Sequence, residues 1–344
     1  MKKYQRLAQQ IISQIELGVW QPGDKLPSLR EQVTSSGMSF MTVGHAYQML
    51  ESQGRIVARP QSGYYVAARP TGQQPMPPAQ VMRDEAVDIN TYIFDVLQAS
   101  RDPSVVPFAS AFPDPRLFPL QQLNRSLANV SKTATAMSVI ENLPPGNVDL
   151  RHAIARRYAQ QGMNISPDEI VITAGALEAL NLSLQAVTEP GDWVIVENPC
   201  FYGALQALER LKLKALSVAT DVREGIDLNA LAQALNDYPV KACWLMTNGQ
   251  NPLGFTLSAD KKAQLIALLA EHNVTLIEDD VYSELYYGRE KPLPAKAWDR
   301  SDMTLHCSSF SKCLVAGFRI GWVAAGKHAR RIQQLQLMST LSTS

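Results

Sequence analysis

Apolar side chains recur at helical spacing along the start of the chain. Leu7, Ile11 and Ile15 are four residues apart, which predicts a helix with one buried face, and Gly18 is a typical helix end. After the turn QPGDKLP, Ser28 precedes Glu31 by three residues. This is the spacing of a capping box, in which each side chain satisfies a free backbone N–H of the other residue, and it predicts a second, short helix.

A third helix and a hairpin are predicted after the break at SSGM. The third helix has Val43, Ala46, Tyr47 and Leu50 on its inner face and ends at a glycine. The stretch RIVARPQSGYYVAA then alternates apolar residues on either side of a turn that contains glycine, which is typical of a two-stranded hairpin. Three helices with short turns and a hairpin predict a winged helix-turn-helix domain over residues 1–68.

The pattern changes twice further along the chain. Residues 69–87 are rich in proline, glutamine and glycine and lack apolar periodicity, which indicates a linker. From residue 88 onward, short apolar runs alternate with amphipathic segments, which predicts an α/β domain with a mostly parallel, helix-covered sheet over residues 88–344. The apolar runs read EIVITAG, DWVIVEN, ACWLMTN, VTLIEDD and MTLHCSS.

Composition limits the class of protein. The 344 residues are 46% hydrophobic, enough for two or three domains with buried cores, and no apolar run is long enough to cross a membrane. The N-terminal segment is amphipathic rather than secretory and the four cysteines form no CxxC pair, so we expect a cytoplasmic protein with reduced thiols. The histidines are scattered, and His306 and Cys307 fall on opposite faces of a predicted strand, so no metal site is expected.

Charge is unevenly distributed although the formal net charge is zero. Residues 1–70 hold eight Lys or Arg against four Asp or Glu, and the remainder of the chain holds twenty-four against twenty-eight. The basic N-terminal end is therefore the candidate for binding double-stranded DNA.

The N-terminal domain resembles the GntR-type DNA-binding domain over nearly all of residues 1–68. The segments GVWQPGDKLPSLREQV and TVGHAYQMLESQGRIVARPQSGYYV carry the resemblance. Hydroxyl and backbone N–H groups at a helix N-terminus can hold phosphates, and an arginine can reach a guanine edge or a phosphate. The resemblance implies DNA contacts from the second helix, the recognition helix and the wing, by Ser28, Arg30, Ser39, Thr42, Arg59 and Gly63.

One departure from the family pattern bears on base readout. Where the family usually has arginines flanking the TV pair, this chain has Phe40 and Gly44. Base contacts from the recognition helix are therefore expected to be weaker than, or different from, those usual in the family.

Polar clusters follow the predicted strands of the second domain. Because the carboxyl ends of parallel strands lie at one edge of a sheet, where open α/β sheets bind ligands, we expect these clusters to meet. The stretch SSFSKCLVAGFRIGW supplies Lys312, hydroxyl donors and the planar guanidinium of Arg319, a set that suits a phosphorylated carbonyl compound. The other clusters are TAGALEAL, ENPCFYG, NGQNPLG and EDDVY.

Together these clusters resemble the fold type I aminotransferases, which use pyridoxal 5′-phosphate, over roughly residues 105–344. The resemblance implies that Lys312 forms the Schiff base with the cofactor and that Asp279 keeps the pyridine nitrogen protonated, so that the ring can accept electrons. Tyr282 and Asn251 would hydrogen-bond the ring hydroxyl. The phosphate would be bound by Ser309 and Arg319 with Ser311 close by, and backbone N–H groups near Gly175, Ala176 and Leu177 can face an anion.

Two positions of the cofactor site have alternatives. The aromatic residue that stacks on the ring in the family corresponds to Phe201, with Tyr202 beside it. Asp280, next to Asp279, is the alternative partner of the ring nitrogen.

A GntR-type head, a proline-containing linker and an aminotransferase-like body together resemble the MocR subfamily of transcriptional regulators. The resemblance implies a cytoplasmic homodimer that binds an operator and senses an amino compound through aldimine exchange. One alternative is a true aminotransferase with an accessory DNA-binding head, and another is a winged-helix protein with a cofactor-free dimerisation body. Family members continue into a smaller C-terminal domain that carries the arginine for a substrate carboxylate, so the chain is expected to be truncated after the segment RRIQQLQLMSTLSTS.

Overall fold

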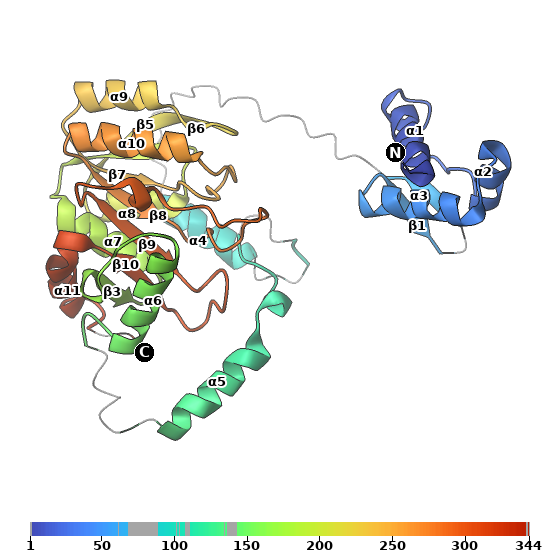
Figure 1. The fold of residues 1–344 in the computed structure, drawn as a ribbon. Helices are drawn as coiled ribbons and strands as arrows, with labels where there is room; N and C mark the ends of the chain where they lie inside the picture. The colour runs from blue at the N-terminus through green and yellow to red at the C-terminus, as the bar shows by residue number, and fades with distance from the viewer. Residues whose placement is uncertain are drawn as a thin grey trace. The chain divides into compact units, whose positions relative to one another are not determined.

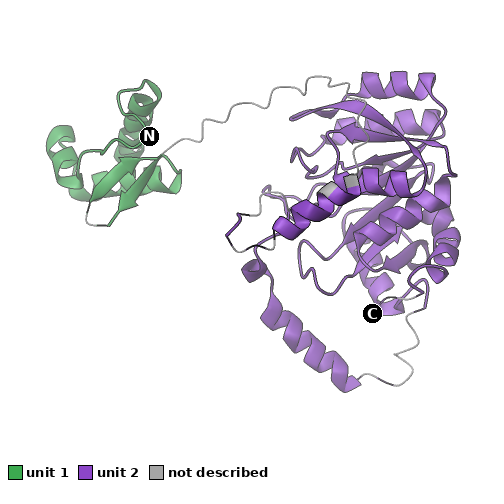
Figure 2. Ribbon diagram, turned by 180° about the vertical axis from the view of Figure 1, so that it is seen from behind, with its two compact units in different colours: residues 1–85 green, residues 86–344 purple. Residues whose placement is uncertain are grey.

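The computed structural model describes residues 2–60, 62–67, 89–100, 102, 104–106, 111–133, 135, 143–341 and 343. The chain divides into two compact units, residues 1–85 and residues 86–344, each with its own hydrophobic core (Figure 2). The predicted linker, residues 69–87, lies outside the described residues.

The first unit consists of three helices and a hairpin, as the sequence predicts. Apolar residues of the first and third helices and of the hairpin form one core, and Tyr47 is fully buried in it. Arg59 pairs with Gly63 where the hairpin turns. This arrangement is a winged helix-turn-helix, so the predicted domain type is confirmed. Its elements are α1 (Lys3–Glu16), α2 (Leu29–Ser36), α3 (Phe40–Ser52), β1 (Ile56–Arg59) and β2 (Gly63–Val66).

Two serines begin the second and third helices. The Ser28 hydroxyl accepts a hydrogen bond from the Glu31 backbone N–H at 3.3 Å, and the Ser28 N–H donates to the Glu31 carboxylate at 2.7 Å, which is the predicted capping box. Ser39 caps α3 by accepting from the Thr42 backbone N–H at 3.3 Å. Because caps satisfy only part of the free N–H groups of a helix start, both sites keep donors that favour a phosphate.

The second unit is built on one eight-stranded sheet with the order β3-β10-β9-β8-β7-β4-β5-β6 (Figure 1). The pairs from β5 through β4, β7 and β8 to β9 are parallel. Strand β10 runs antiparallel to both of its neighbours, so β3 points the same way as the parallel strands, and the predicted mostly parallel sheet is confirmed. The strands are β3 (Ile170–Thr173), β4 (Trp193–Asn198), β5 (Lys214–Asp221), β6 (Gly225–Ile226), β7 (Val240–Leu245), β8 (Thr275–Asp279), β9 (Thr304–Ser309) and β10 (Gly321–Ala324).

Helices cover both faces of this sheet. One core joins α7, α8 and α11 to the sheet, and the cores on the opposite face include α9, α10 and α6 (Figure 1). In α5, no residue is buried. The α-helices are α4 (Ile89–Ala99), α5 (Leu120–Thr133), α6 (Val148–Gln160), α7 (Ala176–Val187), α8 (Tyr202–Arg210), α9 (Leu228–Asp237), α10 (Ala259–Glu271) and α11 (Ala329–Leu337), with 3-10 turns at Pro115–Leu117, Pro167–Glu169, Ala295–Trp298 and Gly326–His328.

Alternation along β8 decides which face each acidic residue of its C-terminal end meets. Ile277 packs in the core with α7, whereas Leu276 packs in the core on the opposite face. Because successive side chains of a strand point to opposite faces, Asp279 lies on the α7 side and Asp280, the residue after the strand, lies on the other.

No helix in the described ranges combines the length and the apolar character needed to span a membrane.

Candidate functional site

A cavity of about 630 Å³ lies at the carboxyl ends of the strands of the second unit. Its volume is in the range of small-molecule sites, and its position is where open α/β sheets bind ligands. The structure brings nearly all the predicted cofactor residues into its wall, with Gly175 directly before the first of them. These residues are Ala176, Leu177, Phe201, Asn251, Asp279, Tyr282, Ser309, Ser311, Lys312 and Arg319.

Lys312 projects into this cavity from the loop after β9. Its Nζ donates a hydrogen bond to the Ala111 carbonyl oxygen at 2.8 Å and lies 3.7 Å from the centroid of the Phe112 ring. Burial lowers the pKa of Lys312, Asp279 opposes this effect, and Arg319 lowers the pKa further. A lowered pKa increases the fraction of neutral amine, which is the form that attacks a carbonyl carbon.

Asp279 presents a buried carboxylate to the same cavity. Burial, and after it the charge of Asp280, raises the pKa of Asp279 to about 7, while the indole of Trp244 on neighbouring β7 opposes the rise. Within the described part of the chain, Asp279 Oδ1 has no hydrogen-bond partner. A buried carboxylate oxygen without a partner is costly, and a protonated ring nitrogen in the cavity would satisfy it.

An anion cradle lies where α7 begins. The Arg319 guanidinium donates from Nη2 to the Ala174 carbonyl oxygen at 3.2 Å and crosses directly over Gly175, where a Cβ would come within 2.6 Å of Nη2. Gly175 has a φ of 94° and is the N-cap of α7, whose free N–H groups carry partial positive charge. The buried Ser311 hydroxyl has no partner among the described residues. Guanidinium, hydroxyl and helix N-terminus together fit a phosphate group.

Aromatic side chains form another part of the wall. Burial, and after it the charge of Asp279, raises the pKa of Tyr282 to about 12, and the side chain of Asn251 opposes the rise. The rings of Phe201 and Tyr202 lie side by side, with centroids 4.7 Å apart and planes tilted by 48°, and both line the cavity. Phe201 packs over Gly203, where a Cβ would come within 2.4 Å of its ring. The choice of stacking residue therefore stays a prediction.

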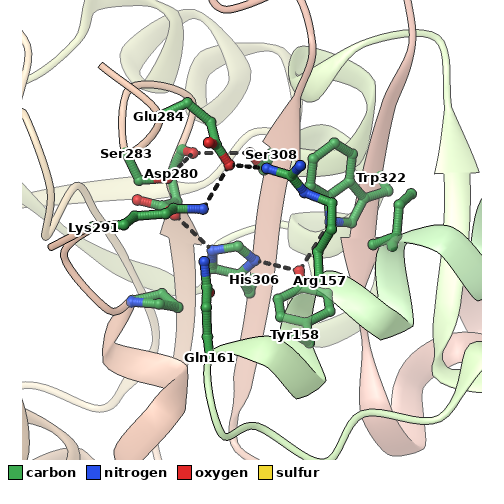
Figure 3. A pocket seen from close by; sticks show the side chains of 12 residues that line it. Arg157, Tyr158, Gln161, Asp280, Ser283, Glu284, Lys291, His306, Ser308 and Trp322 are labelled. Carbon is green, nitrogen blue, oxygen red and sulfur yellow. Dashed lines mark hydrogen bonds and ion pairs between the residues drawn. The ribbon is translucent and has the colours of Figure 1, made fainter. Parts of the chain in front are cut away.

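Asp280 belongs to a buried network on the opposite face of the sheet (Figure 3). Its Oδ2 lies 3.0 Å from His306 Nε2, and His306 Nδ1 lies 2.6 Å from the Tyr158 hydroxyl. Trp322 Nε1 donates to that hydroxyl at 2.9 Å. Because the indole can only donate, the hydroxyl accepts from Trp322 and can donate to His306, which then donates to Asp280.

This network keeps Asp280 ionised and away from the large cavity. Burial raises the pKa of Asp280, but the hydrogen bond from His306, with a further hydrogen bond from Asn248 at 2.9 Å, outweighs it and holds the pKa below its ordinary value. A small cavity of about 20 Å³ beside these residues has room for about one water molecule. At its rim, Glu284 contacts Arg157 and accepts from Lys291 Nζ at 2.6 Å (Figure 3).

The predicted DNA-binding residues lie on the helix starts and the hairpin of the first unit. Ser28 and Arg30 are at the start of α2, and the hydroxyls of Ser39 and Thr42 are 2.9 Å apart at the start of α3. At the hairpin, Arg59 lies 4.3 Å over the centroid of the Tyr65 ring, and Gly63 has a φ of 108° that favours glycine. Ser28, Arg30, Ser39 and Arg59 are exposed, and Thr42 and Gly63 are half-buried.

Comparison with known proteins agrees with both predicted domain types, the GntR-type DNA-binding domain and the aminotransferase-like domain. Residues 3–66 match the gntR family of bacterial regulatory proteins, and residues 119–344 match the class I and II aminotransferases. Over 344 residues the chain is 83% identical to the HTH-type transcriptional regulator YdcR of Escherichia coli (strain K12), covering all of this chain and 74% of that protein. The chain belongs to the MocR subfamily of GntR-type regulatory proteins.

Other relatives bear on the two halves of this MocR-type chain. The regulator YjiR of the same organism is 37% identical over 98% of this chain and 72% of its own length. The body also resembles the crystal structure of the Pyrococcus horikoshii kynurenine aminotransferase, which was solved with PMP, at 28% identity and a TM-score of 0.68. That likeness covers 73% of this chain and 64% of the enzyme. The GntR domain implies DNA binding, and the aminotransferase fold implies pyridoxal phosphate.

Several residues of the site carry no sequence signal of their own. Ala111 and Phe112 precede the first predicted strand by many positions and belong to no motif, yet both contact Lys312. Trp244 and His306 lie inside apolar runs, where a packing role is the ordinary interpretation. Only the register of neighbouring strands brings these residues to Asp279 and Asp280.

Proposed function

We propose that this MocR-type protein is a DNA-binding transcriptional regulator whose body holds pyridoxal 5′-phosphate and senses an amino compound. The observation that carries the proposal is the convergence of Lys312, Asp279 and Arg319 on one cavity, in a chain that also has a GntR-type head. As working boundaries we take residues 1–68 for the head, 69–87 for the linker and 88–344 for the body.

Each cavity residue has a role that follows from its surroundings. Bound pyridoxal phosphate supplies an aldehyde that condenses reversibly with primary amines and a ring that accepts electrons. Asp279 would accept the ring N–H, and Tyr282 and Asn251 would orient the ring hydroxyl. Lys312 would hold the aldehyde carbon until an incoming amine releases its Nζ. The phosphate would accept hydrogen bonds from Ser309, Ser311, Arg319 and the first N–H groups of α7.

The head would supply the contacts to DNA. The exposed hydroxyls and guanidinium groups at the starts of α2 and α3 and at the hairpin suit phosphates on both sides of a groove. We propose that the protein acts as a cytoplasmic homodimer, because two identical heads match the two half-sites of a symmetric operator.

A second candidate function is amino-acid transamination. It is favoured by one specific observation, the presence in one cavity of the lysine, the aspartate and the tyrosine that such chemistry uses. Regulation and turnover predict different behaviour because only a sensor couples the cavity to DNA.

The decisive experiment is a titration of the cofactor-loaded full chain with a series of primary amines, followed at the cofactor absorbance, with and without operator DNA selected from random duplexes. A sensor gives an amine affinity that changes when DNA is bound, and by linkage the DNA affinity changes with the amine by the same factor, about 5- to 150-fold. Arg30→Ala, which removes a proposed DNA contact and leaves the cavity unchanged, serves as the control. Identical amine affinities together with rapid turnover on a keto acid would assign the chain to the enzymes.

A further inference from the structure

The exposed face of the recognition helix α3 is apolar and uncharged at its start. Phe40 is 54% exposed and Met41 is 69% exposed, and both lie in the first turn. One and two turns further on, the same side of the helix carries Gly44, His45 and Gln48. The sequence of α3 contains no Lys or Arg, and its one acidic residue follows near its end.

This exposure is a property of the fold, because the other side of α3 is fully used. Val43, Ala46, Tyr47 and Leu50 are completely buried in the core of the first unit. Rotating the helix to hide Phe40 would expose that core, so the phenyl ring and the neighbouring thioether stay in contact with water until a partner covers them. Burying such surface is favourable by the hydrophobic effect.

Gly44 leaves open space between the apolar turn and the rest of the face. A Cβ at this position would have no atom within 4 Å, so the helix surface is low there and a base edge can approach the backbone closely. The Lys and Arg residues of the first unit lie outside α3, and among them are the exposed Arg30 of α2 and Arg59 of the hairpin. The helix that faces the groove therefore differs in chemistry from the elements on either side of it.

We infer that Phe40 and Met41 read the C5-methyl groups of thymines in the major groove, so that operator half-sites carry thymine opposite the start of α3. Guanine readout in the major groove is made mainly by bidentate Arg or Lys, which α3 lacks, whereas the thymine methyl is the one apolar group that a base pair presents there. This inference rests on the proposed DNA-binding function and adds the class of base that the helix selects.

The test uses duplexes selected by the full chain from a random library, followed by replacement of single thymines with deoxyuridine, which removes only the methyl group. At the contacted positions, each replacement should weaken binding about fourfold, the effect of losing one buried methyl group. Replacements elsewhere in the duplex serve as the matched control. Phe40→Ala and Met41→Ala each change an exposed position. Where the replaced base is one that the altered residue contacts, each variant should bind the duplex with thymine and the duplex with deoxyuridine equally well.

The outcomes separate this inference from the function on which it rests. If the full chain selects no duplex, DNA binding itself fails. If it binds tightly but thymine and deoxyuridine duplexes are equivalent at every position, the methyl readout is wrong while DNA binding stands. If Phe40→Ala leaves the methyl effect unchanged but weakens self-association in sedimentation, the face belongs to a second copy of the chain, and the inference is overturned.

Discussion

Asp279 and Asp280 are neighbours in the chain, but they lie on opposite faces of the sheet and have opposite electrostatic surroundings. Asp280 receives hydrogen bonds from His306 and Asn248 and keeps a low pKa. Asp279 has Oδ1 unpartnered within the described residues, and the charge of Asp280 adds to the effect of burial on its pKa. The hydrogen bonds to Asp280 thus keep a negative charge next to the Asp279 carboxylate, which lines the cavity.

The raised pKa of Asp279 predicts a pH effect on the stability of the cofactor-free protein. A carboxyl group whose pKa rises on folding from 3.8 to about 7 stabilises the native state fully below pH 4, and this contribution is lost as the pH rises to 7. The Asp279→Asn variant lacks this loss. Between pH 5 and pH 8 its free energy of unfolding should therefore fall by on the order of 2–3 kcal/mol less than that of the native chain. Urea unfolding at both pH values measures the difference.

The control for this pH effect is Asp95→Asn, which changes an exposed aspartate in α4. Glu197, whose pKa burial raises to about 8, adds a loss of its own, and the charge of Asp279 contributes a small part of that rise. The same comparison in a Glu197→Gln background therefore isolates the effect of Asp279. If the free energy of unfolding changes equally with pH in the native chain and in Asp279→Asn, the raised pKa of Asp279 is wrong.

Lys312 predicts a covalent test. Borohydride treatment of the cofactor-loaded chain should fix the cofactor to Lys312, detectable as a mass increase on its peptide, and the Lys312→Ala variant should show no adduct. Lys132→Ala, which removes an exposed lysine of α5, should label like the native chain. An adduct of unchanged yield in Lys312→Ala would remove this residue from the proposed role.

At the scale of elements, the starts of α2 and α3 and the hairpin are the parts of the head that meet DNA in the proposal. Loss of one phosphate contact weakens binding to all sequences alike and reduces the salt dependence by about one unit of slope. Arg30→Ala should therefore bind DNA several-fold more weakly, with a shallower plot of log affinity against log salt, measured by fluorescence anisotropy. Arg6→Ala on α1 makes the same charge change elsewhere, and an equal effect from it would show that overall charge, not the start of α2, decides binding.

Strands differ in how much of their structure the sequence predicts. Strands β3, β4, β7, β8 and β9 were predictable because they are buried on both faces and form continuous apolar runs. Strand β5, near the edge of the sheet, alternates exposed residues with half-buried or buried ones and produces no such run. Strand β10 is buried throughout, but it directly follows the cavity loop, so its apolar residues continue the motif SSFSKCLVAGFRIGW and do not stand out as a separate strand. The cavity motifs were predictable because they follow predicted strands, whereas Phe112 and His306 depend on tertiary packing alone.

At the scale of the whole molecule, the two units have separate hydrophobic cores and a different ligand each in the proposal. A ligand stabilises only the unit that binds it, by about 2.7 kcal/mol at one hundred times its Kd. Pyridoxal phosphate should therefore raise the Tm of the body in calorimetry and leave that of the head unchanged. A single transition that moves as a whole would show that the units unfold together.

The loop between β9 and β10 has a consequence for how such proteins diverge. Its frame is set by paired, buried strand residues, from Ser309 with Gly321 to His306 with Ala324, and not by Lys312. Within the described residues, the lysine side chain donates its hydrogen bond to one carbonyl oxygen, so replacing it leaves the frame in place. One codon change can thus remove covalent chemistry from a lineage without unfolding the protein.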